Sequence, residues 1–536
     1  MVSPSIELTL TPEVVDDAAI GIRVRYVLHD LGLEENDTLC RLPKVLFGVD
    51  AAVVADDGIR ATDDDGELPL THGLDEPTPS FTFRRWRTRR ASVGDIHVEY
   101  VAPVRVVTAA TTNGPLFDLR AEGSGVSGAG VAFLALPDRE ETFTAEIGWD
   151  LSQLPKGARG VSSHGENTVR RTATTEALTF TFYMAGMLGS YPESPDPAFG
   201  MFWLSDTKFD ATEVGRHSHL LYQQMCEFFQ EPDPGFRVFV RKHPFRGNGG
   251  SALPGSRGFM FGWSDEETQS SEDLKRLLSH ETVHNWPLLP GDPEAVSWFN
   301  EGTAEYYSLL LPHRFGLIDD DTLVELFNER AHGYYGNPLQ TLSNAEAAEL
   351  YWKDWRAQRI PYGRGLFYLL DTDHKIGQAS GGRRGVDDLV LGLLDRLRRG
   401  QEVTVQDWVD MVVAELGEAG SRDYEAMTAG ARILPATDCL APRFVAREVD
   451  IRQLNVGFDY TSLRTRTVTG VVAGGPADRA GVRDGDEIVD SPPPHGLPQR
   501  PVSEISLTLK RGEEMLRVHY EPLGELAPGR LWDKSN

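Results

Sequence analysis

The stretch SHETVHNWPLLP (Ser279–Pro290) holds two histidines four positions apart, with a glutamate directly after the first. Ser270 or Ser271 can cap a helix that runs into this stretch, and Pro287 predicts that the helix stops just after Trp286. His280 and His284 then lie one turn apart on the same helix face. Because a pair at this spacing offers zinc two nitrogen ligands without backbone strain, the stretch predicts one half of a metal site.

The glutamate between the histidines, Glu281, has a different predicted role. At this position it points toward a metal-bound water rather than toward the metal, which suits a general base. In a chain with 14 histidines the pattern HExxH can also arise by chance. The alternative interpretation is a pair of hydrogen-bonded histidines on a buried helix face.

A second helix follows almost immediately and offers a third ligand. Asp292 is a good N-cap, Pro293 is a good first helical residue, and we expect Pro312 to end the helix. Glu301 falls in its middle, on a stripe that also contains a tryptophan and a leucine. A carboxylate on a largely apolar face is costly to bury unless it is paired or bound to a cation. We therefore predict that Glu301 completes a zinc site with the two histidines.

Two neighbours of Glu301 bear on this prediction. Gly302 would allow another backbone to approach closely, which a metal site between two helices requires, although glycine in a helix costs about 1 kcal/mol. Glu305 lies one turn further along the same helix. It is either a partner of a ligand histidine or an exposed helix charge, and the sequence leaves both interpretations open.

These residues resemble a known group of enzymes. HETVHNW, with Glu301 of WFNEGTAEYY sixteen intervening residues after His284, is similar to the gluzincin metallopeptidases, whose third-ligand signature is NEG followed by a small residue. The stretch Ile360–Val390 and the order of the domains resemble the glycyl aminopeptidase family of that clan. The resemblance implies one zinc ion held by His280, His284 and Glu301, a peptide substrate, and Glu281 as the general base.

The same resemblance implies that Tyr362, in a Tyr-x-Arg/Lys-Gly element that precedes a helix, faces the oxyanion of the transition state. A phenol donates a hydrogen bond at neutral pH without carrying charge, which suits a developing negative charge on oxygen. Tyr351 and Tyr368 are alternatives for this role. Packing of Tyr362 against Phe367 in the core is the other interpretation.

One departure from the family pattern affects specificity. Aminopeptidases of this clan carry a glycine-rich strand with a glutamate that binds the free amino group of the substrate. The corresponding passage here is Gly250, Ser251, Ala252 and Leu253, which contains no carboxylate. We expect Gly249, Gly250, Ser251 and Ala252 to offer a backbone edge to the substrate, while the usual amine anchor is missing.

The pattern along the chain changes twice. Residues 1–175 contain short alternating segments separated by Gly, Pro, Asp and Asn clusters, which predicts an all-β sandwich. A helix within Phe209–Gln230 and a strand over Phe236–His243 begin an α/β lobe that leads into a series of helices. By the resemblance, residues 176–445 are a thermolysin-like zinc peptidase domain. The predicted fold class is multidomain α+β.

Residues 446–536 resemble a PDZ-like β domain with a C-terminal tail. VTGVVAGGPADRAGVRDGDEIVD (Val468–Asp490) has the order of strand, Gly-Pro-Ala turn, short helix and strand entry. LNVGF (Leu454–Phe458) stands where such domains place free backbone N–H groups that hold a peptide C-terminus. A module that packs on the catalytic lobe and binds nothing is the alternative.

Composition disfavours other function classes. The chain has 536 residues, 53 basic and 81 acidic side chains and a net charge of -28, which disfavours binding to nucleic acid or anionic membranes. Cys40, Cys226 and Cys439 are widely separated and form no CxxC pair. Because no signal-peptide pattern and no long apolar run occurs, we expect a cytoplasmic protein.

The sequence thus predicts a zinc-dependent metallopeptidase, first of all an aminopeptidase acting on small N-terminal residues such as Gly or Ala. The missing amine anchor motivates a second enzyme hypothesis, an endopeptidase or a hydrolase of blocked peptides. A third hypothesis, of another class, is a non-catalytic peptide-binding or chaperone-like protein that uses the PDZ-like groove.

Overall fold

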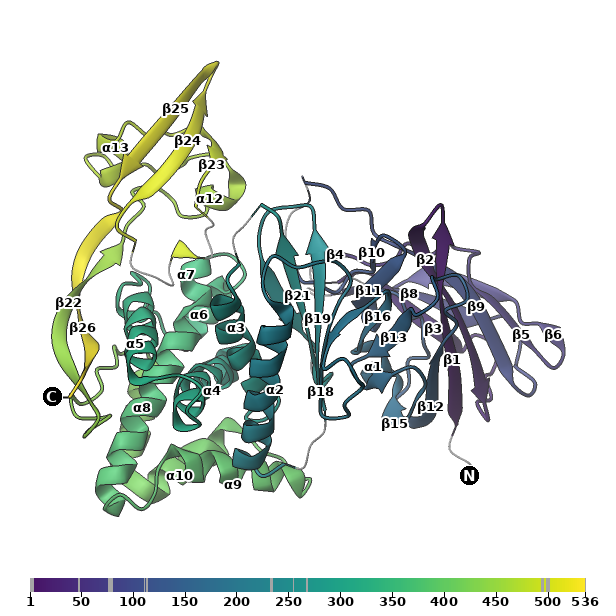
Figure 1. The fold of residues 1–536 in the computed structure, drawn as a ribbon, viewed down its shortest axis with the longest axis horizontal. Helices are drawn as coiled ribbons and strands as arrows, with labels where there is room; N and C mark the ends of the chain where they lie inside the picture. Colours follow the sequence, from purple (N-terminus) through teal and green to yellow (C-terminus); the bar gives the residue numbers. More distant parts are fainter. Residues whose placement is uncertain are drawn as a thin grey trace. The chain divides into compact units, whose positions relative to one another are not determined.

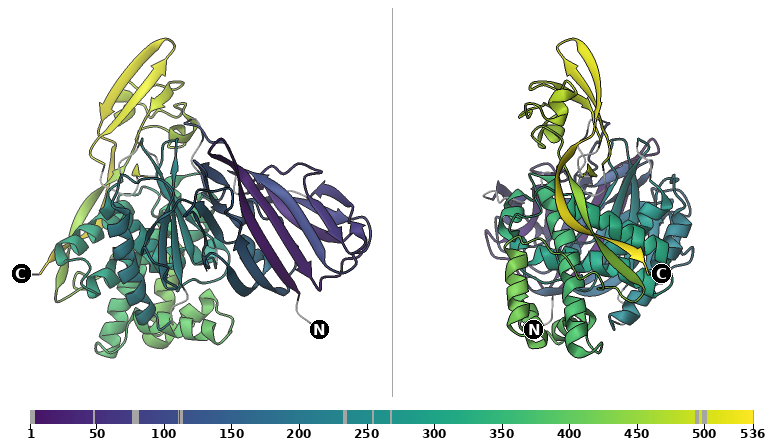
Figure 2. Two further views of the ribbon diagram at one scale, coloured as in Figure 1. Left: turned by 45° about the vertical axis from the view of Figure 1, so that its right-hand side comes forward. Right: turned by 90° about the vertical axis from the view of Figure 1, so that its left-hand side faces the viewer.

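The computed structural model describes residues 4–46, 49–75, 81–109, 111, 114–231, 235–253, 255–266, 269–492, 496–497 and 502–535. The chain packs into two compact units, Met1–Leu278 and Ser279–Asn536. Strands dominate the first unit, and the second combines helices with further strands (Figures 1 and 2). The mixed helix and sheet character expected from the sequence is confirmed, whereas the three domains 1–175, 176–445 and 446–536 stay a prediction.

The first unit begins with two sheets. The larger one contains seven strands in the order β15 (Val169–Thr174), β12 (Thr142–Trp149), β1 (Ser5–Val15), β2 (Ala18–His29), β9 (Ile96–Pro103), β5 (Arg60–Asp63) and β6 (Gly66–Glu67). The smaller one contains β4 (Val49–Asp50), β3 (Thr38–Leu46), β8 (Phe81–Thr88) and β7 (Leu70–Leu74). Side chains from both, among them Leu8, Val24, Cys40 and Trp86, share one buried cluster. Their period-two burial explains the alternating segments of the sequence.

Two five-stranded sheets complete the first unit. One contains, in order, β10 (Arg120–Glu122), β11 (Gly125–Ala129), β16 (Phe182–Gly186), β13 (Arg159–Ser162) and β14 (Gly165–Glu166), with the short helices η1 (Gly130–Ala132) and α1 (Thr175–Thr179) nearby in sequence. The other contains β17 (Gly189–Tyr191), β18 (Phe199–Trp203), β19 (Phe236–His243), β21 (Gly258–Ser264) and β20 (Gly249–Ala252). The predicted strand is confirmed as β19. The predicted helix is confirmed as α2 (Ala211–Phe228), which is capped by the carboxylate of Asp210.

Nine helices follow among the described residues between Ser271 and Thr428, and the first two of them carry the sequence motif. They are α3 (Ser271–Val283), α4 (Pro293–Arg314), α5 (Asp320–Tyr335), α6 (Asn344–Leu350), α7 (Trp355–Gln358), α8 (Ile360–Ser380), α9 (Val386–Arg398), α10 (Val405–Leu416) and α11 (Glu418–Thr428). In the second unit α4 and α8 lie side by side (Figure 1). Most residues of both helices are buried, so this pair forms the centre of the unit.

Two predicted helix limits are wrong. Pro312 does not end α4, because the N–H of Phe315 reaches back to the carbonyl of Leu311 and carries the helix to Arg314. Proline removes only its own N–H bond, so the last turn forms around it. Tyr362 does not precede a helix but lies in the first turn of α8, in which Pro361 occupies an early position that needs no N–H donor.

A glycine contact sets the separation of α4 and α8. A Cβ added to Gly302 on α4 would lie 2.5 Å from the Cα of Gly365 on α8. A Cβ on Gly365 would lie 1.9 Å from the carbonyl oxygen of Trp298. The close backbone approach predicted at Gly302 is therefore confirmed, and its partner is a second glycine that the sequence did not reveal.

Replacing Gly365 with alanine should lower the free energy of unfolding by about 1–3 kcal/mol, because the new methyl group forces two packed backbones apart. Gly377→Ala on the same helix is the matched control, since a Cβ there meets nothing within 4 Å. That control should stabilise the protein by up to about 1 kcal/mol through helix propensity. Urea unfolding measures both, and a Gly365→Ala variant as stable as Gly377→Ala would contradict the contact.

The C-terminal part of the second unit contains a long ribbon and a small separate core. The ribbon pairs β22 (Phe444–Leu454) with β26 (Leu523–Lys534) in antiparallel register (Figure 2) and packs on α5. Trp532 of β26 stacks on Phe367 with a centroid distance of 5.5 Å. The core joins α12 (Ser462–Thr465) and α13 (Pro476–Arg479) to a sheet of β23 (Glu487–Asp490), β24 (Ile505–Arg511) and β25 (Glu514–Tyr520). The PDZ-like assignment stays a prediction.

Candidate metal centre

Three potential ligand atoms converge where the sequence predicted a metal site. The Nε2 atoms of His280 and His284 are 3.2 Å apart, and Oε2 of Glu301 lies 3.3 Å from the first and 3.6 Å from the second. Tetrahedral zinc with bonds of about 2.0–2.1 Å places its ligand atoms about 3.3 Å from one another. The three donors therefore fit the corners around one ion.

The donor set also fits a cation chemically. Oε2 of Glu301 is buried and has no hydrogen-bond donor in the protein, a state that is costly for a carboxylate unless a cation satisfies it. Within the described part of the chain, His280, His284 and Glu301 form the group of His, Cys, Asp or Glu side chains that could jointly hold a metal ion. Two imidazoles and one carboxylate leave a fourth tetrahedral position for water or substrate, as in catalytic zinc sites.

The local backbone brings the two histidines together slightly differently from the prediction. Ser270 caps α3, because its Oγ accepts the N–H of Asp273 at 3.0 Å. The helix ends at Val283, three residues earlier than expected, and the N–H of Trp286 turns back to the Val283 carbonyl at 3.0 Å. His284 thus lies in the turn that follows α3, yet this tight turn keeps its ring beside His280.

Charge interactions within the centre shift the pKa values of His280 and Glu301 in opposite directions. Burial by itself would lower the pKa of His280, but the close carboxylates of Glu301 and Glu305 outweigh it and raise that pKa to about 10. Burial would likewise raise the pKa of Glu301, yet His280 and His284 hold it well below its ordinary range. A cation bound by these groups takes the place of the shared proton.

Glu305 is buried, with 6% of its surface exposed, so its interpretation as an exposed helix charge is wrong. One of its oxygens lies 3.3 Å from Nδ1 of His280, and the other accepts Nε of Arg330 at 2.5 Å. Burial would raise the pKa of Glu305, but the charge of Arg330 and the contact with His280 lower it to about 2. A proton on Nδ1 of His280 donates to Glu305 and leaves the Nε2 lone pair facing the other two ligands.

Glu281 lies on α3 next to His280, one of the two candidate ligand histidines. Burial raises the pKa of its carboxyl above the ordinary value, while the charges of His280 and His284 oppose this rise. A carboxylate with a raised pKa is a better base near neutral pH. The electrostatic setting is thus the one that a general base needs.

The tyrosine candidates separate into two groups. The ring of Tyr362 stacks on His280 with a centroid distance of 5.7 Å, and Tyr351 is close enough to hydrogen-bond with Tyr362. Tyr368 instead packs on Trp298 in the core, and Phe367 stacks on the C-terminal ribbon rather than on Tyr362. Burial raises the pKa of Tyr362 well above its ordinary value, so its phenol stays protonated and can donate.

The sequence did not predict two charged neighbours of the centre. Arg330 on α5 holds Glu305, and the guanidinium carbon of Arg359 lies 4.7 Å from the centre of the Tyr362 ring. No motif marks either residue. Only the position of Arg359, three residues before Tyr362 and directly before the segment that carries the family resemblance, could have drawn attention to it.

The predicted substrate strand is present in the first unit as β20, the edge strand next to β21. A Cβ on Gly250 would lie 1.9 Å from the ring of Phe259, which explains the glycine. Oγ of Ser251 accepts the N–H of Leu116 at 3.0 Å. Gly249 and Ala252 complete the strand without a carboxylate, and substrate binding by these residues stays a prediction.

Comparison with known proteins gives a fold but no sequence family. No family model and no curated protein matches the chain. An aminopeptidase N family protein from Idiomarina loihiensis has a similar structure, with a TM-score of 0.66 and 14% identity over 99% of this chain and 98% of that one. An M1 zinc metallopeptidase from Deinococcus radiodurans aligns over 81% of this chain and 96% of its own, at 16% identity and a TM-score of 0.46, too low to support any conclusion.

At such low identity the first likeness shows a shared fold and nothing about activity. That fold extends over nearly the whole chain, which agrees with the expectation of a multidomain arrangement of helices and sheets. The narrower resemblance to the glycyl aminopeptidase family stays a prediction, as does the PDZ-like domain.

Three backbone N–H groups of the loop LNVGF already have hydrogen-bond acceptors. The N–H of Leu454 donates to Gly336, that of Asn455 to Pro522, and that of Gly457 to the side chain of Asn455. These N–H groups, which we expected to be free, are therefore already engaged. Binding of a peptide C-terminus in this loop would have to break such bonds.

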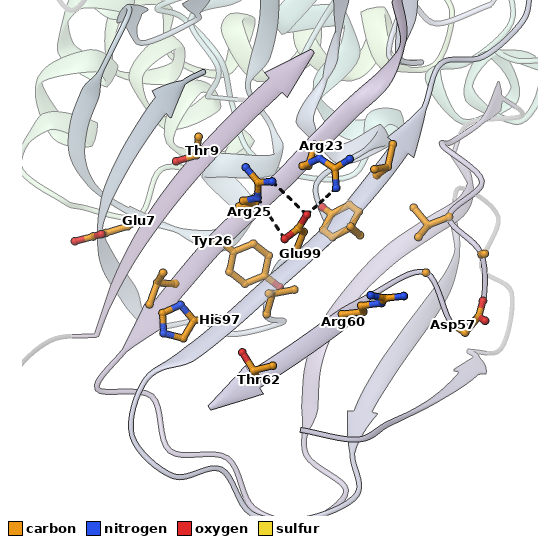
Figure 3. A pocket seen from close by; sticks show the side chains of 17 residues that line it. Glu7, Thr9, Arg23, Arg25, Tyr26, Asp57, Arg60, Thr62, His97 and Glu99 are labelled. Carbon is orange, nitrogen blue, oxygen red and sulfur yellow. Dashed lines mark hydrogen bonds and ion pairs between the residues drawn. The ribbon is translucent and has the colours of Figure 1, made fainter. Parts of the chain in front are cut away.

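An open groove of about 960 Å³ lies on the seven-stranded sheet of the first unit (Figure 3). Glu99 stands between Arg23 and Arg25, at 2.7 Å from Nη1 of Arg23 and 3.3 Å from Nε of Arg25. None of the predicted metal, catalytic or substrate residues lines the groove. Because these residues lie elsewhere, we assign the groove no catalytic role.

Helix length and composition bear on a membrane role. Among the described helices, none combines the length and the apolarity that crossing a bilayer demands.

Proposed function

We propose that this protein is a zinc-dependent metallopeptidase in which His280, His284 and Glu301 hold the ion. The observation that carries this proposal is the set of donor separations, 3.2, 3.3 and 3.6 Å, which suits one tetrahedral cation. The unsatisfied oxygen of Glu301 supports it independently. When bound, zinc would polarise the scissile carbonyl and make a water molecule acidic near neutral pH.

The remaining side chains supply the proton transfers. Glu281 accepts a proton from the attacking water and passes it to the leaving amine, as its raised pKa allows. The phenol of Tyr362 donates a hydrogen bond to the carbonyl oxygen as negative charge develops there. Tyr351 stays the alternative donor, since its phenol lies beside that of Tyr362. Glu305 and Arg330 hold His280 in position.

Within this class we favour an aminopeptidase that acts on small N-terminal residues such as Gly or Ala, in line with the family resemblance. The absence of a carboxylate from Gly249–Ala252 favours a second candidate, a hydrolase of blocked or internal peptide bonds. A non-catalytic peptide-binding protein is less compatible with the site, because a structural zinc site fills its fourth position with a protein ligand and needs no general base.

A comparison of substrates tests these alternatives. An aminopeptidase hydrolyses free-amino glycyl and alanyl amides and rejects their N-acetylated forms, whereas the second candidate cleaves the acetylated forms as well. Zinc analysis of the same preparation should give one ion per chain. A zinc-loaded protein that hydrolyses neither set would contradict the proposal and favour a binding function.

A further inference from the structure

Arg359 brings a positive charge into the proposed site. Its guanidinium carbon lies 4.7 Å from the centroid of Tyr362, whose ring stacks on the ligand His280 at 5.7 Å. Burial is the main cause of the raised pKa values of Glu281, Tyr351 and Tyr362, and the charge of Arg359 opposes it in each case. The guanidinium therefore belongs electrostatically to the centre.

This guanidinium lacks the partners that neighbouring arginines have. Nε of Arg359 is buried without a hydrogen-bond acceptor, and no carboxylate of the described residues forms an ion pair with it. Arg356, three residues earlier, pairs with Asp354 at 2.7 Å, and the buried Arg364 donates to the carbonyl of Gln340 at 2.8 Å. A partly buried cation without a partner is costly, so an anion from outside the chain would stabilise it.

The charge balance of the site leads to the same conclusion, and this step rests on the proposed metal-dependent function. A divalent cation is balanced by the carboxylates of Glu281 and Glu301. Glu305 and Arg330 neutralise each other through their ion pair. Arg359 then leaves one positive charge in excess, which a substrate with one negative charge near the scissile bond would compensate.

Peptides offer carboxylates as their anionic groups, and a guanidinium binds a carboxylate through two parallel hydrogen bonds. Arg359 and His280 both contact the ring of Tyr362, at 4.7 Å and 5.7 Å from its centroid, so a few residues of extended peptide at about 3.4 Å each are enough to reach from one to the other. We propose that Arg359 binds a substrate carboxylate, either the C-terminal carboxylate of a short peptide or the side chain of an acidic residue close to the scissile bond.

Two matched substrate pairs test this proposal. The first is Ala-Ala-Ala against its C-terminal amide, and the second is Ala-Glu-Ala amide against Ala-Gln-Ala amide. The wild-type enzyme should favour the carboxylate member of one pair by at least about tenfold in kcat/KM, the value of a charge-assisted hydrogen bond. The first pair reports a terminal carboxylate and the second an acidic side chain.

Variants then test whether Arg359 causes the preference for the carboxylate substrate. Arg359→Gln should reduce the preference to about one, because only the carboxylate member of a pair loses its contact, and Arg359→Lys should keep part of the preference because the charge remains. Arg356→Gln is the matched control, since Arg356 already pairs with Asp354, and it should keep the full wild-type preference.

Binding measurements on an inactive variant test substrate recognition separately from the chemical step. In a Glu281→Gln background, calorimetry with Ala-Ala-Ala and its amide should show the same preference in Kd, and Arg359→Gln should abolish it.

Equal reaction of both members of each pair with wild-type enzyme would overturn the proposal. So would an equal loss of activity on all substrates in Arg359→Gln, which would mean that Arg359 only balances the charge of Glu281. Failure of wild-type enzyme to cleave any of the peptides would instead contradict the peptidase function itself.

Discussion

Glu281→Gln is expected to lower kcat by about 10²- to 10⁴-fold while the protein keeps its zinc, because the amide has nearly the same shape but cannot accept the proton of the attacking water. The three donors of the metal site are other residues, so metal content should stay at one ion per chain. Initial rates on the best peptide substrate, measured together with zinc analysis, give both quantities on one sample.

The same helix offers a matched control for this substitution. Glu272 lies in the first turn of α3, where its carboxylate is 68% exposed and pairs with Lys275. Glu272→Gln makes the same chemical change away from the centre and should keep wild-type kcat. Wild-type activity in Glu281→Gln would remove Glu281 from the mechanism, and loss of zinc in that variant would show that Glu281 supports the metal instead.

Glu301→Gln is expected to lose the metal together with the activity. The substitution removes the only negative charge among the three donors and replaces it with a neutral amide. Zinc prefers anionic or imidazole ligands to amides, so affinity should fall by more than the roughly 10- to 100-fold that loss of a supporting residue costs. Competition with a graded series of chelators measures the affinity.

Substitutions of two further glutamates on α4 give zinc affinities with which the affinity of Glu301→Gln can be compared. Glu305→Gln should weaken zinc binding by about 10- to 100-fold, because it loosens the partner of His280 without removing a ligand. Glu294→Gln, at an exposed position in the first turn, should leave the affinity unchanged. An affinity of Glu301→Gln equal to that of Glu294→Gln would exclude Glu301 as a ligand.

Much of the metal centre was accessible from spacing alone. The four-residue interval between His280 and His284 and the apolar stripe around Glu301 predicted which side chains meet, and one potential ligand atom of each lies within 4.8 Å of the other two. The strand β19 and the cap at Ser270 were accessible in the same way. Such features depend on the geometry of one turn or one strand, which neighbouring residues determine.

The predicted C-terminal limits of α3 and α4 are wrong because tertiary packing, as well as the local sequence, determines where a helix ends. Pro312 was expected to stop α4, but a proline in the last turn costs one hydrogen bond while the surrounding buried residues keep the helix intact. His284 was placed inside α3, yet it lies in the turn after it. The metal-binding geometry tolerates this difference because a tight turn keeps successive side chains close.

What the sequence determined by itself is the chemistry of the centre: two imidazoles and a carboxylate as donors, with Glu281 beside them. Only the tertiary structure decided the surroundings. It placed Glu305 and Arg330 behind His280, joined Gly302 to Gly365, and brought the unpaired Arg359 to the ring of Tyr362. The first two contacts join different helices, and nothing in local sequence spacing encodes the distance between elements that meet only when the core packs. Arg359 and Tyr362 are only three residues apart, and there the structure shows what spacing does not: no carboxylate of the described residues pairs with the guanidinium.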